Sequence, residues 1–172
     1  MAVCVSAGIA AAAVNTAGVP NFQKVNDSVY RGAQPTEEGF KNLAAMGVKT
    51  VVDLREPGEH SQAREEAWVK ADGMRYVSVP LRGMSAPPDG EVQKVLGILN
   101  DPSAGPVFMH CRRGADRTGT MVACYRISHD HWTTRNALNE ARTLGMHFYE
   151  WAMQDYVTKF GAMELTGSAS AR

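Results

Sequence analysis

Residues 106–129 constrain the fold of this chain more than any other segment, because they combine an apolar run, a loop that contains glycine and an amphipathic run. Residues 106–110 are typical of a short buried strand. From residue 118 to 129 apolar side chains recur at spacings of three and four, which predicts a helix. A strand, a tight loop and a helix in this order direct backbone N–H groups and the positive end of the helix dipole at one point. The segment therefore predicts an anion cradle.

The rest of the chain of 172 residues alternates in the same way. The pattern predicts an edge strand at 29–31, strands at 48–54 and 75–79, and helices at 36–46, 59–71, 87–100, 133–143 and 148–159. Such alternation is typical of one α/β domain with a mainly parallel sheet of four or five strands flanked by helices, with its site beyond the carboxyl ends of the strands. In the last two helices we expect the larger apolar side chains to pack in the core, namely Trp132, Leu138, Phe148, Trp151 and Tyr156.

The loop carries the residue types of a thiolate nucleophile. Cys111 directly follows the strand, and Arg117 closes the loop six residues later. A cysteine attacks as the thiolate, whereas a free thiol titrates at about 8.5, so nearby N–H groups, a helix N-terminus and cations have to favour ionisation. The planar fork of Arg117 suits two phosphoryl oxygens. Gly114 allows the turn, and the Thr118 hydroxyl is placed to steady the sulfur.

The sequence His110-Cys111, five residues, Arg117-Thr118-Gly119 resembles the signature of the protein tyrosine phosphatase superfamily. Segments 21–25, 29–35 and 48–55 extend the resemblance to the atypical dual-specificity phosphatases of plants, fungi and bacteria, over about residues 21–160. The resemblance implies a phosphotyrosine phosphatase-like fold and hydrolysis of phosphate monoesters through a phosphocysteine intermediate. His110 and Thr118 are expected to support the nucleophile, and the phosphate is expected to contact Arg112, Arg113, Gly114, Ala115, Asp116 and Arg117.

Two aspartates compete as the general acid that protonates the leaving oxygen. The resembling families usually place this acid on a loop before the nucleophile strand, where Asp89 is the only aspartate between residues 82 and 91. Asp89 also stands where a helix cap is expected. Asp116 lies inside the loop and resembles the loop aspartate that some bacterial phosphatases use for proton transfer, with pairing to an arginine as its structural alternative. The choice between the two stays open.

Two substrate classes also stay open, phosphorylated proteins and phosphorylated inositols or lipids. The sequence shows no aromatic recognition loop upstream, which favours a shallow cleft over a deep phosphotyrosine pocket. Arg112 and Arg113 are suited to additional phosphates, or are ordinary solvated side chains. An inactive phosphate-binding module is disfavoured because both Cys111 and Arg117 are present.

The amino-acid composition limits the binding partners and the cellular location that we expect for this chain. Lys+Arg and Asp+Glu are equal at 18 each, so no global field attracts nucleic acid, and we expect a monomer without nucleic-acid partners. Residues 1–20 form an Ala-rich leader typical of a signal-peptide remnant, whose apolar run at 2–14 is too short for a stable membrane anchor. The location is therefore cytoplasmic or, if the leader is an export signal, periplasmic. The phosphatase domain is expected at 21–163 and a flexible tail at 164–172.

We expect no metal and no cofactor. His129 and His131 stand two residues apart near a helix end, where they do not share a face. Cys4 lies in the leader and Cys124 in the middle of a helix, and neither spacing suggests a metal site. His60 and His147 are next to loops, and the sequence assigns them no role.

Overall fold

The computed structural model describes residues 15–170 and shows a five-stranded sheet in the order β1-β2-β5-β3-β4. β1 pairs with β2 in antiparallel fashion, and the other three pairings are parallel. This arrangement confirms the predicted α/β class and the mainly parallel sheet. The strands are β1 (Gln23–Lys24), β2 (Val29–Gly32), β3 (Thr50–Asp53), β4 (Arg75–Ser78) and β5 (Val107–His110).

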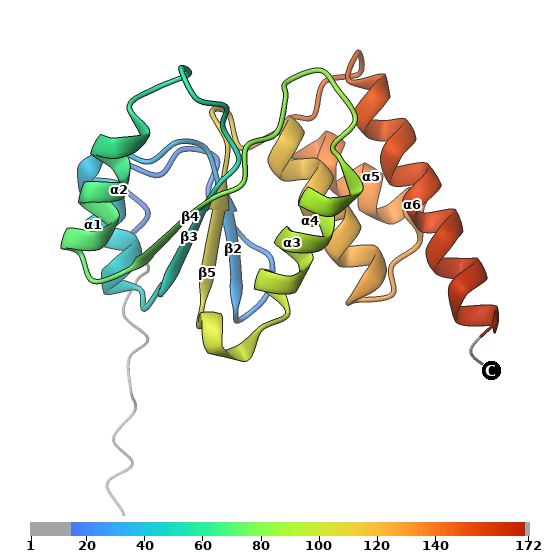
Figure 1. Cartoon of the computed structure of the whole chain (residues 1–172), viewed down its shortest axis with the longest axis horizontal. Helices are drawn as coiled ribbons and strands as arrows, with labels where there is room; N and C mark the ends of the chain where they lie inside the picture. Colours follow the sequence, from blue (N-terminus) through green and yellow to red (C-terminus); the bar gives the residue numbers. More distant parts are fainter. Residues whose placement is uncertain (1–14, 171–172) are drawn as a thin grey trace, which may run out of the picture.

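Helices cover both faces of the sheet, as Figure 1 shows. On one side lie α1 (Glu37–Ala45) and α2 (Gln62–Ala71), drawn in blue-green at the left. On the other side lie α3 (Asp89–Leu99), α4 (Asp116–Ser128), α5 (Thr134–Thr143) and α6 (Trp151–Ser170). The connections that follow β3, β4 and β5 all leave from the carboxyl ends of parallel strands, so they gather at one end of the molecule, the top in Figure 1.

The alternation of side chains along the central strands creates two cores. Val51 and Phe108 face α1 and α2, whereas Val52 and Met109 face the layer of α3 to α6. All four residues of β3 and all four of β5 are buried, as expected of central parallel strands. β5 therefore ends at a fixed point inside the molecule, and the residue that follows it is Cys111.

Several element boundaries differ from the prediction. β2 is not an edge strand, because β1 pairs with its outer side. The predicted helix at 59–71 begins only at Gln62, where Ser61 accepts a hydrogen bond from the Arg64 N–H as its cap. α4 begins at Asp116 rather than at residue 118, and α6 continues to Ser170 rather than ending near residue 159.

Two aromatic side chains that we expected in the core are exposed. Phe148 is 88% exposed and Trp151 is 75% exposed, in and just after the connection between α5 and α6. The prediction of a packing role is wrong for these two, because no second layer formed by the described residues covers this connection. Leu138 is buried and Tyr156 is partly buried against the core, as expected.

The Ala-rich leader at 2–14 and Cys4 lie outside the described residues, and the predicted domain boundaries stay predictions. None of the described helices is both long enough and apolar enough to cross a membrane. Cys124 is a free, buried cysteine, and burial raises the pKa of its thiol to about 12. It therefore behaves as a small apolar side chain in the core, which is the role that the sequence indicates.

Candidate active site

The loop between β5 and α4 forms the centre of the candidate site. Cys111 is buried directly after β5, and α4 begins five residues later without a side-chain cap on its first N–H groups. Gly114 has φ +69°, and a Cβ there would lie 2.3 Å from backbone atoms of Gly32. The loop thus rests directly on the end of β2, which only glycine permits. Arg31 fastens this contact, because its Nη2 donates to the Gly114 carbonyl at 2.6 Å.

Arg117 projects from the first turn of α4 into a set of oxygen acceptors. Its Nη2 donates to Glu59 Oε2 at 2.9 Å, and its Nη1 contacts Glu59 Oε1 and donates to the Leu81 carbonyl at 3.2 Å. Burial alone would lower the pKa of Arg117, but the hydrogen bond with Glu59 and the charge of Cys111 raise it above its usual value. The hydrogen bond from Arg117 in turn holds the pKa of Glu59 below its usual value. The arginine is therefore fixed and fully charged beside the nucleophile.

Glu59 is a site residue that the sequence analysis missed. The predicted helix at 59–71 would have placed it on a solvated first turn, whereas it lies in the loop between β3 and α2. The signal that was available is the Ser61 cap, which predicts a helix starting after residue 61 and leaves Glu59 in the connection at the carboxyl end of β3.

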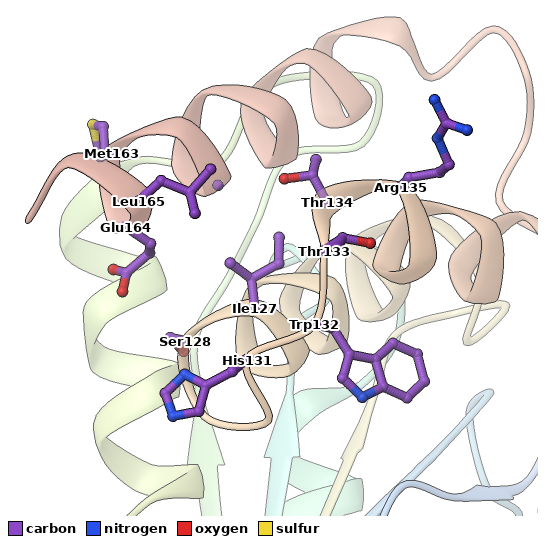
Figure 2. A pocket seen from close by; sticks show the side chains of 11 residues that line it. Ile127, Ser128, His131, Trp132, Thr133, Thr134, Arg135, Met163, Glu164 and Leu165 are labelled. Carbon is purple, nitrogen blue, oxygen red and sulfur yellow. The ribbon is translucent and has the colours of Figure 1, made fainter. Parts of the chain in front are cut away.

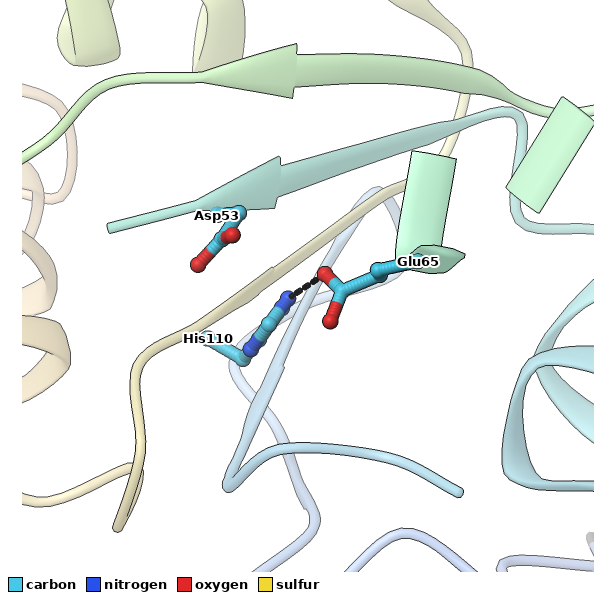
Figure 3. A group of neighbouring side chains, drawn as sticks. All are labelled: Asp53, Glu65 and His110. Carbon is cyan, nitrogen blue, oxygen red and sulfur yellow. Dashed lines mark hydrogen bonds and ion pairs between the residues drawn. The ribbon is translucent and has the colours of Figure 1, made fainter. Parts of the chain in front are cut away.

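His110 precedes the nucleophile and belongs to a buried polar network, part of which is drawn in Figure 3. One of its ring nitrogens, Nε2, lies 3.0 Å from Glu65 Oε1. Arg55 donates from Nε to Asp53 at 2.8 Å and also bonds Glu65, and the Tyr76 hydroxyl donates to Asp53 at 2.7 Å. Hydrogen bonds and nearby charges together outweigh burial for both carboxylates, and the pKa values of Asp53 and Glu65 lie below normal. The network fixes the ring of His110, and the supporting role of this residue stays a prediction.

Atoms of Asp53, Glu65 and His110 lie within 4.8 Å of one another, a spacing that would suit a metal ion. The guanidinium of Arg55 already bonds both carboxylates of this group. The guanidinium of Arg55 therefore supplies the positive charge that a metal ion would supply, and we assign no metal to this cluster.

Asp89 bonds a helix of the outer layer. It is the first residue of α3, where Pro88 is the cap residue and no side chain makes a capping hydrogen bond. Its Oδ1 instead accepts from the Tyr156 hydroxyl of α6 at 2.8 Å. This contact gives Asp89 a role in joining two helices.

Asp116, which the sequence placed inside the loop, is the first residue of α4, and both of its carboxylate oxygens accept hydrogen bonds. Oδ1 accepts from the backbone N–H of His147 at 3.0 Å, and Oδ2 accepts from Arg113 Nη1 at 3.1 Å. The same nitrogen of Arg113 lies 2.6 Å from His147 Nδ1. The structure thus adds His147, to which the sequence assigned no role, and places the connection between α5 and α6 beside the loop.

The remaining residues of this region lie around the loop. Ala115 is buried in the loop, and Arg112 is exposed, with its side chain unpaired among the described residues. The Thr118 hydroxyl is buried and has no hydrogen-bond partner in the described part of the chain, so the predicted bond to the sulfur is not formed here. Arg82 lies in the loop after β4 and lines a small hollow together with Arg117.

A large cavity lies elsewhere. It encloses about 940 Å³ between the end of α4, the start of α5 and the last turns of α6, as Figure 2 shows. Ile127 and Ser128 line it, at the opposite end of α4 from Arg117. None of the predicted site residues contributes to it, so chemistry and not cavity size identifies the active site.

A family profile described as "DSP-PTPase phosphatase fused to NAD+ Kinase" matches residues 13–159. The chain belongs to this phosphatase family. Among family relatives, the chain is 33% identical over 126 residues to the dual specificity protein phosphatase TpbA of Pseudomonas aeruginosa, covering 73% of this chain and 55% of TpbA. It is 28% identical over 154 residues to the inositol diphosphatase SIW14 of Saccharomyces cerevisiae, covering 83% of this chain and 54% of SIW14.

Solved structures of the same two phosphatases share the fold. The catalytic core of SIW14 in complex with citrate matches with a TM-score of 0.74 at 25% identity, covering 91% of this chain and 95% of that core. TpbA in complex with pTyr matches with a TM-score of 0.69 at 28% identity, covering 89% of this chain and 94% of that structure. The chain spans about half the length of these curated relatives.

Proposed function

We propose that this chain is a cysteine-dependent phosphatase that hydrolyses phosphate monoesters through a phosphocysteine intermediate. The observation that carries the proposal is the placement of the buried Cys111 and the fixed, charged Arg117 on one loop at an uncapped helix N-terminus. Loop N–H groups and the arginine fork suit the equatorial oxygens of a phosphoryl group, whose negative charge spreads over them in the transition state.

The reaction has two steps. The Cys111 thiolate attacks phosphorus, an S–P bond forms, the P–O bond breaks, and the leaving oxygen takes up a proton. Water then attacks the phosphocysteine, the S–P bond breaks, and inorganic phosphate and the thiolate are released. Arg117 and the loop hold the phosphoryl oxygens in both steps, so the protein's contribution is mainly positioning and electrostatic stabilisation.

Replacement of the nucleophile tests this function. We expect Cys111→Ser to abolish turnover of nitrophenyl phosphate while phosphate still binds, because a hydroxyl fills the same space but does not ionise near neutral pH. Vanadate, which resembles the transition state, should inhibit the unmodified chain. Activity of the serine variant above a small fraction of normal would refute the covalent mechanism, as would complete loss of activity with a chelator and recovery with a divalent metal.

For the substrate class we propose phosphorylated proteins, as a dual-specificity or tyrosine phosphatase. Exposed aromatic side chains at the connection between α5 and α6, Phe148 and Trp151, stand near the loop because His147 of the same connection bonds Asp116. They give an aromatic or peptide substrate an apolar surface beside the phosphate. The likeness to TpbA, named as a dual specificity protein phosphatase, supports this assignment.

A second candidate is a phosphorylated inositol, favoured by Arg112, whose exposed side chain has no partner in the described part of the chain and directly follows the nucleophile. Such a cation suits a second phosphate on the same ring. Arg112→Ala should then weaken kcat/KM for polyphosphorylated inositols by about tenfold or more, on the order of one lost charge-assisted contact, and leave nitrophenyl phosphate little changed. Arg135→Ala, at the far cavity, is the matched control. Equal effects of Arg112→Ala on both substrates would favour the protein class.

A further inference from the structure

Glu150 is a buried acid beside the loop that carries Cys111, and neither step of the proposed reaction assigns it a role. It stands just before α6 and its residue is only 5% exposed. Its backbone is fixed, because its N–H donates to the His147 carbonyl at 3.1 Å and its carbonyl accepts from the Gln154 N–H at 3.0 Å. Its side-chain Oε2 is buried and has no hydrogen-bond partner among the described residues. Burying a carboxyl group without a hydrogen-bond partner costs less free energy when the group is protonated than when it is ionised.

The groups around Glu150 come from the loop and from its own connection. A carboxyl oxygen of Glu150, one of Asp116 and a ring nitrogen of His147 lie within 4.8 Å of one another. Burial and then the charge of Asp116 raise the pKa of Glu150, while His147, Arg113 and Arg117 act in the opposite direction. The net effect raises the pKa of Glu150, so its carboxyl group takes up a proton more readily than an ordinary glutamate does.

Asp116 is engaged by hydrogen-bond donors. Both of its oxygens accept hydrogen bonds from N–H groups, of the His147 backbone and of Arg113. Asp116 directly precedes Arg117 in the chain, whereas Glu150 belongs to the connection between α5 and α6. Two carboxyls this close hold one proton between them more easily than none.

We propose that Glu150 and Asp116 form a carboxyl pair that shares one proton and supplies it to the leaving oxygen. This inference rests on the proposed phosphatase function. As the Cys111 thiolate forms the S–P bond and the P–O bond breaks, the proton of the pair passes to the departing oxygen and leaves both carboxylates ionised beside Arg113. In the second step the pair takes back a proton from the attacking water while the S–P bond breaks.

The test uses leaving groups that differ in their need for a proton. An alkyl oxygen, as in a phosphoserine peptide, leaves poorly without protonation, whereas nitrophenolate leaves readily. We expect Glu150→Gln to lower kcat/KM for the phosphoserine peptide by about tenfold or more and for nitrophenyl phosphate by less than about threefold, within the range of general acid catalysis. The matched control is Asp155→Asn, which removes an exposed carboxylate of α6 that pairs with Lys159. This control should leave kcat/KM unchanged for both substrates.

A double variant distinguishes a pair from two independent residues. Asp116→Asn should give the same selective loss, and the double variant should be little worse than either single one, because one shared proton is lost only once. In the unmodified chain, kcat/KM for the phosphoserine peptide should fall with rising pH while that for nitrophenyl phosphate does not. This profile needs no substitution, so a profile without this difference would overturn the proposed proton transfer even if Glu150→Gln folds poorly.

Three results would overturn the pair: an equal loss on both substrates, no loss on either, or a double variant whose loss is the product of the single losses. Failure of the proposed function has a different signature. In that case the unmodified chain would fail to hydrolyse nitrophenyl phosphate, or Cys111→Ser would remain active, whereas loss of the pair alone leaves nitrophenyl phosphate turnover dependent on Cys111.

Discussion

The contact between the loop and β2 predicts the effect of one added methyl group. Gly114 has φ +69°, and a Cβ at this position would lie 2.3 Å from the Gly32 carbon and oxygen and 2.5 Å from the Ala33 nitrogen. These are backbone atoms at the end of a strand that pairs on both sides, so they cannot turn aside as a flexible side chain does. The loop has to move instead.

The magnitude follows from two costs. An alanine in the left-handed region costs about 1–2 kcal/mol. An extra carbon in a filled site costs about 1–3 kcal/mol. We therefore expect Gly114→Ala to lower the free energy of unfolding by about 2–5 kcal/mol, which many single domains survive at a typical stability of about 5–15 kcal/mol. Because the moved loop carries Cys111, kcat/KM for nitrophenyl phosphate should fall by about a hundredfold or more.

Urea unfolding and steady-state kinetics measure both effects. Gly97→Ala is the matched control, because Gly97 lies within α3 and a Cβ there would meet open space, so alanine should stabilise by about 0.5–1 kcal/mol. An unfolding free energy of Gly114→Ala within about 1 kcal/mol of normal, together with normal kinetics, would show that the loop does not rest on β2 in this way.

Three further predictions concern charge and reactivity. The pKa values of Asp53 and Glu65 are lowered in the folded chain, so their contribution to stability is present above the ordinary values of 3.8 and 4.5 and is lost as the pH falls through the lowered values. Glu65→Gln should therefore reduce the fall of the unfolding temperature at acid pH, and an unchanged fall would contradict this contribution of Glu65. Because burial raises the pKa of Cys124 to about 12, Cys124→Ala should leave the rate of inactivation by iodoacetate at neutral pH unchanged, and a slower rate would mean that this thiol reacts. Glu59→Gln should lower kcat about tenfold while phosphate inhibits more tightly, since Glu59 orients Arg117 but repels the dianion; weaker phosphate inhibition with an unchanged kcat would remove Glu59 from the site.

The sequence predicted the centre of the site because its parts are neighbours in the chain. Cys111, Gly114 and Arg117 lie within one short segment, and a strand before them with a helix after them fixes how they converge. The parallel sheet followed from the same reasoning, since strands that alternate with helices need crossover connections. Local pattern and tertiary structure agree for these three residues because they are close together in the sequence.

The residues that the sequence missed come from other connections. Glu59 bonds Arg117 across 58 positions, and His147 bonds Asp116 across 31. No local spacing joins such pairs, because they meet only through the order of the strands and the length of the connections. The exposure of Phe148 and Trp151 was hidden for a related reason, since helical spacing of apolar residues does not say whether another layer covers that helix face.

The charges of the candidate site suit the proposed phosphoryl group before one binds. Arg117 uses Nη1 for Glu59 and two backbone carbonyls, and Nη2 for Glu59, while its Nε donates to no described residue. A phosphate can therefore take Nε and share Nη2 without releasing Nη1, so the guanidinium keeps its orientation as the substrate enters. Arg113 donates to Asp116, but its side chain is about half exposed. Because Arg117 is fixed before the substrate arrives, it needs little reorganisation when charge develops in the transition state, which is the condition under which electrostatic stabilisation is most effective.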